Sequence, residues 1–178
     1  MARHTISLSL SEKSINEAIQ QIELYKDTLQ YKCELLAERL AELGDKAAIM
    51  SISESPLGRT VSMKVDKSPT EMGCTAVLIA IGKTVESEGR EPFCTLLAIE
   101  FGAGAYYNSG NENPKANELG LGVGSYPGQV HAFSDGWYYL GKDNQWHYTH
   151  GVKATMPMYN ASAEIINQYK QIAKEVFN

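Results

Sequence analysis

Three histidines and one isolated glutamate are the residues of this 178-residue chain best suited to chemistry. His131, His147 and His150 fall within 20 residues of one another, and three imidazoles can form a zinc site. His147 and His150, however, are three positions apart on a predicted strand edge, which directs their side chains to opposite faces. We therefore expect no metal site, and we interpret these histidines as surface or core residues.

Glu100 stands at the end of a predicted central strand, between Ile99 and Phe101, and we expect its carboxylate to be buried. Acid–base catalysis needs a second group, and the sequence offers no evident one. The glycine-rich stretch 120–124 lacks the preceding strand, the following helix and the lysine of a phosphate-binding loop. We therefore expect no enzymatic activity and no cofactor.

The composition indicates a single globular domain over 1–178. With 16 basic and 21 acidic residues, the net charge of -5 disfavours a protein that wraps nucleic acid. Cys33, Cys74 and Cys94 are widely spaced, which is typical of buried thiols in a cytosolic protein rather than of disulfides or a zinc ribbon. We expect neither a signal peptide nor a membrane span.

A long helix is predicted over 11–44, with Ser11 as its N-cap and Gly44 as its stop. Its apolar residues recur every seven positions, at Ile15, Ile22, Leu29, Leu36 and Leu43. Such a helix is about 50 Å long, whereas a compact domain of this size is only about 40 Å across. The helix must therefore either bend or project toward a neighbour.

The segment 47–101 predicts four sequential strands, at 47–53, 61–65, 75–85 and 93–101. Because no helix intervenes between them, an antiparallel sheet is expected. The fold class is therefore α+β, with this sheet packed by the long N-terminal helix and by a C-terminal helix over 156–177.

A long glycine-rich loop is predicted over 102–136, and a loop of this length is usually functional or becomes ordered on meeting a partner. An aromatic β-hairpin is predicted over 137–148. Its rings belong to Trp137, Tyr138, Tyr139, Trp146, His147 and Tyr148. They could hold the hairpin together as cross-strand pairs, or they could form an exposed interface.

Two elements in the second half of the chain resemble a known family. The first is Ile99-Glu100-Phe101-Gly102 before the long loop, and the second is Ala154-Thr155-Met156-Pro157-Met158 before the last helix. Together with the intervening Trp137 hairpin they are similar to the tail-completion family, a head-tail joining minor tail component of tailed phages and prophages. The opening helix and early strands match in order and type.

The resemblance implies a structural protein of the virion neck or upper tail, assembled in the host bacterial cytoplasm. Its implied partners are further copies in a ring and neighbouring connector, tail-terminator or tail-tube proteins, with DNA passing through without sequence-specific binding. The candidate interface residues are Glu100, Phe101, Gly102, Trp137, Tyr138, Tyr139, Trp146, Tyr148, Pro157 and Met158.

The hairpin supports one alternative. Gly136-Trp137-Tyr138-Tyr139-Leu140 followed by Trp146 also resembles one unit of the choline-binding repeats of cell-wall proteins, in which rings cage a quaternary ammonium. Those modules repeat the unit several times, whereas this chain has one copy and no apparent secretion signal. A glycan- or choline-binding module is therefore the alternative.

Overall fold

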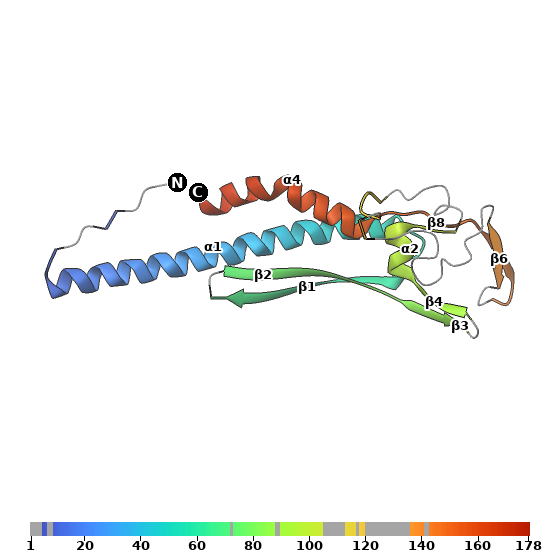
Figure 1. Cartoon of the computed structure of the whole chain (residues 1–178), viewed down its shortest axis with the longest axis horizontal. Helices are drawn as coiled ribbons and strands as arrows, with labels where there is room; N and C mark the ends of the chain where they lie inside the picture. The colour runs from blue at the N-terminus through green and yellow to red at the C-terminus, as the bar shows by residue number, and fades with distance from the viewer. Residues whose placement is uncertain are drawn as a thin grey trace.

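The computed structural model describes residues 5–6, 9–71, 73–87, 90–104, 113–116, 118–119, 136–140 and 143–178. The fold is mixed α+β, with a long N-terminal helix, a C-terminal helix and antiparallel pairs of strands in an elongated body (Figure 1). The predicted fold class is confirmed at this level. Most of the predicted loop over 102–136 lies outside the described residues.

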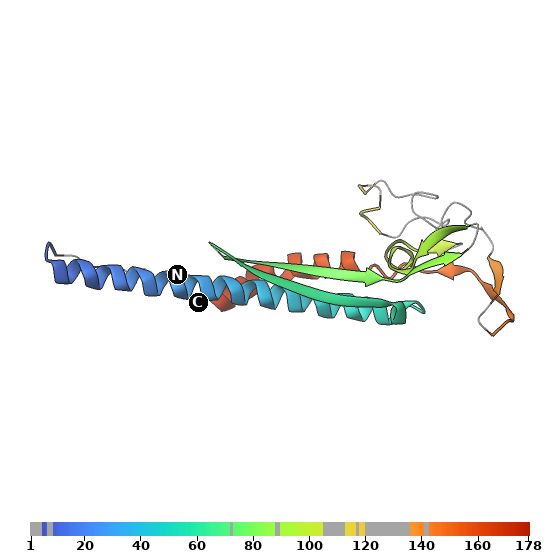
Figure 2. The same ribbon diagram turned by 90° about the horizontal axis from the view of Figure 1, so that it is seen from below.

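The N-terminal helix α1 runs without interruption over Glu12–Ser53. Ser11 caps it, because its Oγ accepts a hydrogen bond of 3.3 Å from the backbone N–H of Ser14. At 1.5 Å per residue, its 42 residues span about 63 Å. The N-terminal part of the helix projects beyond the other labelled elements (Figure 1, Figure 2), while the expected contact with a neighbour stays a prediction.

Gly44 does not end the helix, and the predicted strand over 47–53 is wrong. Alanine and methionine favour helix, and a short apolar run such as 47–50 does not distinguish helix from strand by its period. Gly44 is buried where α1 meets its neighbours, and a Cβ there would lie 2.7 Å from Ile165 Cδ1 and 3.2 Å from Leu78 Cδ2. This glycine therefore allows close packing rather than a helix stop.

The C-terminal helix α4, Pro157–Phe177, lies antiparallel to the second half of α1 (Figure 1). Near its start, Asn160 Nδ2 donates a hydrogen bond of 2.9 Å to Ser51 Oγ. At its end, Lys32 Nζ lies 5.9 Å from the centre of the Phe177 ring. The predicted C-terminal helix is confirmed, and the residues of α1 before Lys32 extend beyond it.

Strands β1, Val61–Thr70, and β2, Gly73–Gly82, form a two-stranded antiparallel hairpin that lies along α1 (Figure 2). Strands β3, Thr84–Ser87, and β4, Arg90–Cys94, form a second pair. The prediction of one sheet of about four strands is therefore matched only loosely, because the described strands pair two by two. The short 3-10 helix η1, Gly58–Thr60, precedes β1.

The predicted strand over 93–101 is also wrong, because the helix α2, Thr95–Phe101, occupies most of it. Ala98, Ile99 and Phe101 are all buried, so α2 carries apolar side chains on several sides. A buried helix and a central strand can both be encoded by a continuous run of apolar residues, so the sequence pattern did not distinguish them here. Thr95 fixes the start of α2, since its Oγ1 accepts a hydrogen bond of 2.9 Å from the backbone N–H of Lys83.

Two further strand pairs complete the described fold. Strand β5, Ala103–Gly104, pairs with β8, Gly151–Val152, and so ties the end of α2 to the segment before α4. Strand β6, Trp137–Leu140, pairs with β7, Trp146–Thr149, which confirms the predicted aromatic hairpin. This hairpin lies at the end of the body opposite the projecting part of α1 (Figure 1, Figure 2).

Replacing Gly82 with alanine is expected to lower the free energy of unfolding by about 1 to 3 kcal/mol, as for other overpacked sites. The new Cβ would lie 2.4 Å from Leu96 Cβ and 2.6 Å from its backbone N, and the backbone cannot move aside easily. Gly73→Ala is the matched control, because the nearest atom to its Cβ would be 3.8 Å away. Urea denaturation measures the free energy of unfolding of both variants. An equal loss of stability in the two would contradict the close packing at Gly82.

Candidate functional site

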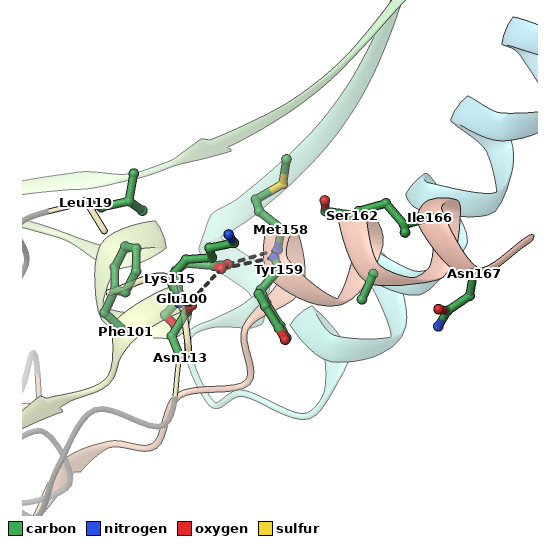
Figure 3. Close-up of a pocket in the computed structure, with 11 residues that line it drawn as sticks. Glu100, Phe101, Asn113, Lys115, Leu119, Met158, Tyr159, Ser162, Ile166 and Asn167 are labelled. Carbon is green, nitrogen blue, oxygen red and sulfur yellow. Dashed lines mark hydrogen bonds between the residues drawn. The ribbon is translucent and has the colours of Figure 1, made fainter. Parts of the chain in front are cut away.

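The carboxylate of Glu100, in the last turn of α2, reaches the first turn of α4 (Figure 3). Its Oε2 accepts a hydrogen bond of 2.9 Å from the backbone N–H of Met158, and its Oε1 accepts one of 3.0 Å from that of Tyr159. Asn113 Nδ2 donates a further bond of 2.9 Å to Oε1. Glu100 is only 7% exposed, so it caps α4 from inside the chain.

The start of α4 needs this distant carboxylate. Met156, at the cap position, has a left-handed backbone (φ 53°, ψ 51°) and makes no side-chain cap hydrogen bond. The first N–H groups of any helix need acceptors from outside it, and a negative charge is favoured there by the helix dipole. Pro157 lacks an N–H, so Glu100 serves the next two residues.

Asn113 connects a third segment to this centre. Besides its bond to the carboxylate, its Nδ2 lies 3.3 Å from the backbone carbonyl oxygen of Glu100, and its Oδ1 accepts a bond of 2.9 Å from the N–H of Lys115. Asn113 lies in the loop predicted over 102–136, and this role of its side chain was missed. An asparagine directly before proline, which favours a turn closed by its own side chain, is the sequence signal that could have indicated it.

Burial raises the pKa of the Glu100 carboxyl above its ordinary value, while the N–H groups of Met158 and Tyr159 and the amide of Asn113 act in the opposite direction. Both carboxylate oxygens accept hydrogen bonds from structural donors. The group is therefore placed to hold the two helices together.

An open pocket of about 430 Å³ lies beside this carboxylate, over the first turns of α4 (Figure 3). Phe101, Leu119 and Ile166 contribute apolar groups to its lining. Lys115, which also lines it, forms an ion pair of 2.6 Å with Glu118. The pocket suits an apolar side chain better than a charged substrate.

Five of the predicted site residues meet at this centre. The two motifs that carry the family resemblance are joined by the bonds from Met158 and Tyr159 to Glu100, although 58 positions separate Glu100 from Met158. Phe101, Gly102 and Pro157 are buried with Glu100, and Met158 is half-buried at the pocket. Four of the five thus lie inside the chain and not on its open surface.

The aromatic hairpin presents the other predicted residues. Tyr138 lies directly opposite Tyr148, with ring centres 5.0 Å apart and planes tilted by 54°. The ring of His150 meets Tyr148 edge-on, also at 5.0 Å. Tyr138, Trp146 and Tyr148 are 65%, 69% and 50% exposed, so much of this aromatic surface faces solvent. The side chains of Trp137 and Tyr139 lie outside the description.

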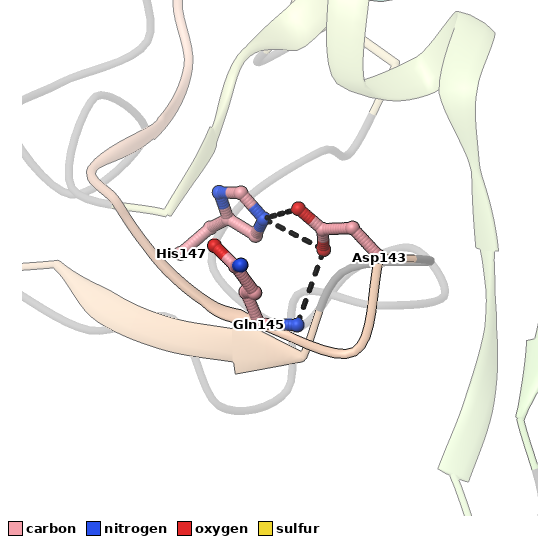
Figure 4. A network of polar contacts seen from close by, with 3 residues as sticks. All are labelled: Asp143, Gln145 and His147. Carbon is pink, nitrogen blue, oxygen red and sulfur yellow. Dashed lines mark hydrogen bonds and ion pairs between the residues drawn. The ribbon is translucent and has the colours of Figure 1, made fainter.

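An aspartate and a histidine brace the turn of the hairpin (Figure 4). His147 Nε2 lies 2.9 and 3.0 Å from the carboxylate oxygens of Asp143, and the N–H of Gln145 donates a bond of 3.2 Å to Asp143 Oδ1. The His147 contact and the Gln145 bond hold the pKa of the Asp143 carboxyl below its ordinary value. This pair was missed in the sequence, although aspartate four residues before histidine across a turn is a usable signal.

The projecting part of α1 carries an apolar stripe formed by Ile15, Ile19, Ile22 and Leu29. Their side chains are between 40% and 55% exposed. The same helix face is covered by α4 and β2 farther along, as at Gly44. The large side chains of the stripe thus face solvent, while Ala18 beside them is only 3% exposed, so this part of the helix face is partly covered.

Among the described residues, no group of three histidine, cysteine, aspartate or glutamate side chains is placed to hold a metal ion. His131 lies outside this set. Likewise, no helix in the described part of the chain is long and apolar enough to span a membrane. Comparison with models of protein families, with curated proteins and with solved structures finds no match to this chain.

The Glu100→Gln variant is expected to unfold with a free energy lower by about 1 to 3 kcal/mol, because the new amide N–H group faces the N–H donors at the start of α4. Chemical denaturation at pH 7 checks this. Glu86→Gln, which changes an exposed carboxylate in β3, is the control and is expected to change stability by less than about 0.5 kcal/mol.

The raised pKa of Glu100 also fixes a pH dependence. The folded chain binds the Glu100 proton more tightly than the unfolded chain does, so protonation adds to the free energy of unfolding. This contribution is complete at pH values below the ordinary pKa of glutamate. It is lost as the pH rises through the raised pKa of the folded state. Between the ordinary pKa and the raised pKa, the parent should therefore lose stability relative to Glu100→Gln. Chemical denaturation of both chains at several pH values measures this, and a difference in the free energy of unfolding that stays constant with pH would contradict the prediction.

The His147→Ala variant is expected to raise the pKa of Asp143 toward its ordinary value, because the largest cause of its lowering is removed. A carboxyl carbon NMR titration measures this shift. His150→Ala is the matched control, since His150 contacts the Tyr148 ring. An equal effect of both variants would contradict the role of His147.

Proposed function

We propose that this chain is a structural protein of the neck or upper tail of a tailed phage or prophage, which joins the head connector to the tail as an oligomer. The observation that carries the proposal is the exposed apolar stripe on the projecting part of α1. A helix face that continues a packed core yet faces solvent is a surface for a partner.

The position of a second surface supports assembly in several copies. The exposed rings of the β6–β7 hairpin lie at the end of the body opposite the α1 stripe (Figure 1). A closed ring is built from head-to-tail contacts, which use two different surfaces of each subunit. An elongated chain with unlike surfaces at its two ends satisfies this requirement.

The two motifs that resemble the tail-completion family also act structurally here. Glu100 of the first motif caps the helix that begins with Pro157 of the second. Such a brace would keep the body rigid while its ends engage neighbouring connector, tail-terminator or tail-tube proteins. The net charge of -5 would let DNA pass a lumen without being held.

The exposure of the hairpin rings favours one alternative, a glycan- or choline-binding module. Tyr138, Trp146 and Tyr148 leave ring faces or edges open to solvent, as a quaternary ammonium would require. Tyr138 and Tyr148, however, pack against each other. Retention of the chain on a choline resin, together with indifference to phage neck proteins, would favour the alternative.

The double variant Ile19→Lys with Ile22→Lys is expected to weaken association by about tenfold or more, because burying even one isoleucine contributes about 1.5 to 3 kcal/mol. Light scattering of the chain alone, and mixed with connector and tail-terminator proteins of a tailed phage, measures the complexes. The matched control is Gln20→Lys with Gln21→Lys, which adds the same charge at exposed polar positions between the two isoleucines. Equal effects of both double variants would count against the stripe as an interface.

A further inference from the structure

The strand β2 has an edge that no described strand covers, since β2 pairs with β1 alone. The N–H of Lys83 donates a bond of 3.2 Å to the carbonyl oxygen of Thr60, which sets the alternation of the antiparallel ladder. Counting back in steps of two, the odd-numbered residues of β2 exchange bonds with β1. Cys74, Ala76 and Ala80 therefore direct their backbone N–H and C=O groups away from β1.

This edge also lacks the features that prevent strands from pairing. Over Gly73–Gly82 the strand contains no charged residue and no proline, and Val77 and Ile81 are about half exposed. The edge of β1, by contrast, carries Lys67 and Pro69. Proline and lysine protect an edge from added strands, so the hairpin is protected on one side and open on the other.

The segment Thr5–Ser11 has the sequence of a strand that would fit such an edge. Ile6, Leu8 and Leu10 alternate with hydroxyl residues, and the segment contains no charge, proline or glycine. In the structure Leu10 is fully exposed. An uncharged, alternating segment can join an uncharged edge without leaving a charge unpaired.

Geometry prevents this segment from reaching β2 of its own chain. Gly73, where β2 begins, lies beside Cys33 of α1, and the rest of β2 lies farther along the helix. Cys33 is 21 residues after Glu12, which is about 32 Å of helix. The seven residues of Thr5–Ser11 span at most about 25 Å. Pairing along β2 is thus possible only between two chains.

We propose that Thr5–Ser11 of one copy adds as a strand to the open edge of β2 in the next copy, with α1 as the rigid spacer between the two. The backbone hydrogen bonds of the added strand would supply affinity, and its alternating side chains would set the register of its pairing with β2. This contact uses different segments of the two copies, so it can repeat from one copy to the next. The inference rests on the proposed oligomeric assembly and specifies one of its joints.

Two blocked variants of the full chain test the joint. Ile6→Lys with Leu10→Lys disables the donor, and Ala76→Pro disables the edge by removing an outward N–H that the β1 ladder does not use. Each variant alone is expected to lose the oligomer that the parent forms, as measured by light scattering. An equimolar mixture is expected to give a heterodimer, because one intact donor and one intact edge remain.

Ser9→Lys, on the polar side of the segment, is the matched control for added charge and should assemble like the parent. Circular dichroism checks that Ala76→Pro keeps its fold, and Ala80→Pro replaces it if it does not. The proposal is overturned if the donor variant assembles like the parent, or if the mixture stays monomeric.

A different pattern separates the two proposals. If the Ile19→Lys with Ile22→Lys variant loses assembly while the donor and edge variants keep it, strand addition is wrong and the structural role stands. A parent chain that is monomeric alone and ignores the neck proteins overturns both.

Discussion

The buried carboxylate of Glu100 is the interaction on which the described arrangement depends. It supplies the acceptors that the first turn of α4 lacks, because Met156 is left-handed and makes no cap of its own. Through Asn113 it also holds a segment of the region between β5 and β6. A buried carboxylate is costly unless its oxygens are satisfied, so this centre is specific to one arrangement of its helices.

From that brace the rest of the body extends in both directions. Helix α4 runs back along α1 and covers it as far as Lys32, where the shorter helix ends. Beyond this point α1 continues as a single helix, and the large side chains of its apolar stripe are between 40% and 55% exposed. The difference in length between the two helices is therefore what creates the candidate interface. The open edge of β2 adds a second unsatisfied surface, in backbone groups rather than side chains.

Local patterns in the sequence predicted the elements whose signals are long or strong. The seven-residue spacing that includes Ile15 and Ile22 predicted α1, and the amphipathic pattern over 156–177 predicted α4. The two tryptophan-containing runs around a short polar turn predicted the hairpin. The errors fell on the short apolar runs 47–53 and 93–101. The same apolar residues can form either a helix or a strand, and contacts with the rest of the chain decide which of the two forms.

The sequence by itself determined the fold class, the long helix and the hairpin, because each depends on local period or capping. Only the tertiary structure decided that Gly44 is a packing contact rather than a helix stop, and that Glu100 caps a helix 58 positions away. It also decided that the strands pair two by two. These features depend on contacts between segments distant in the chain, and no local pattern encodes which segments meet.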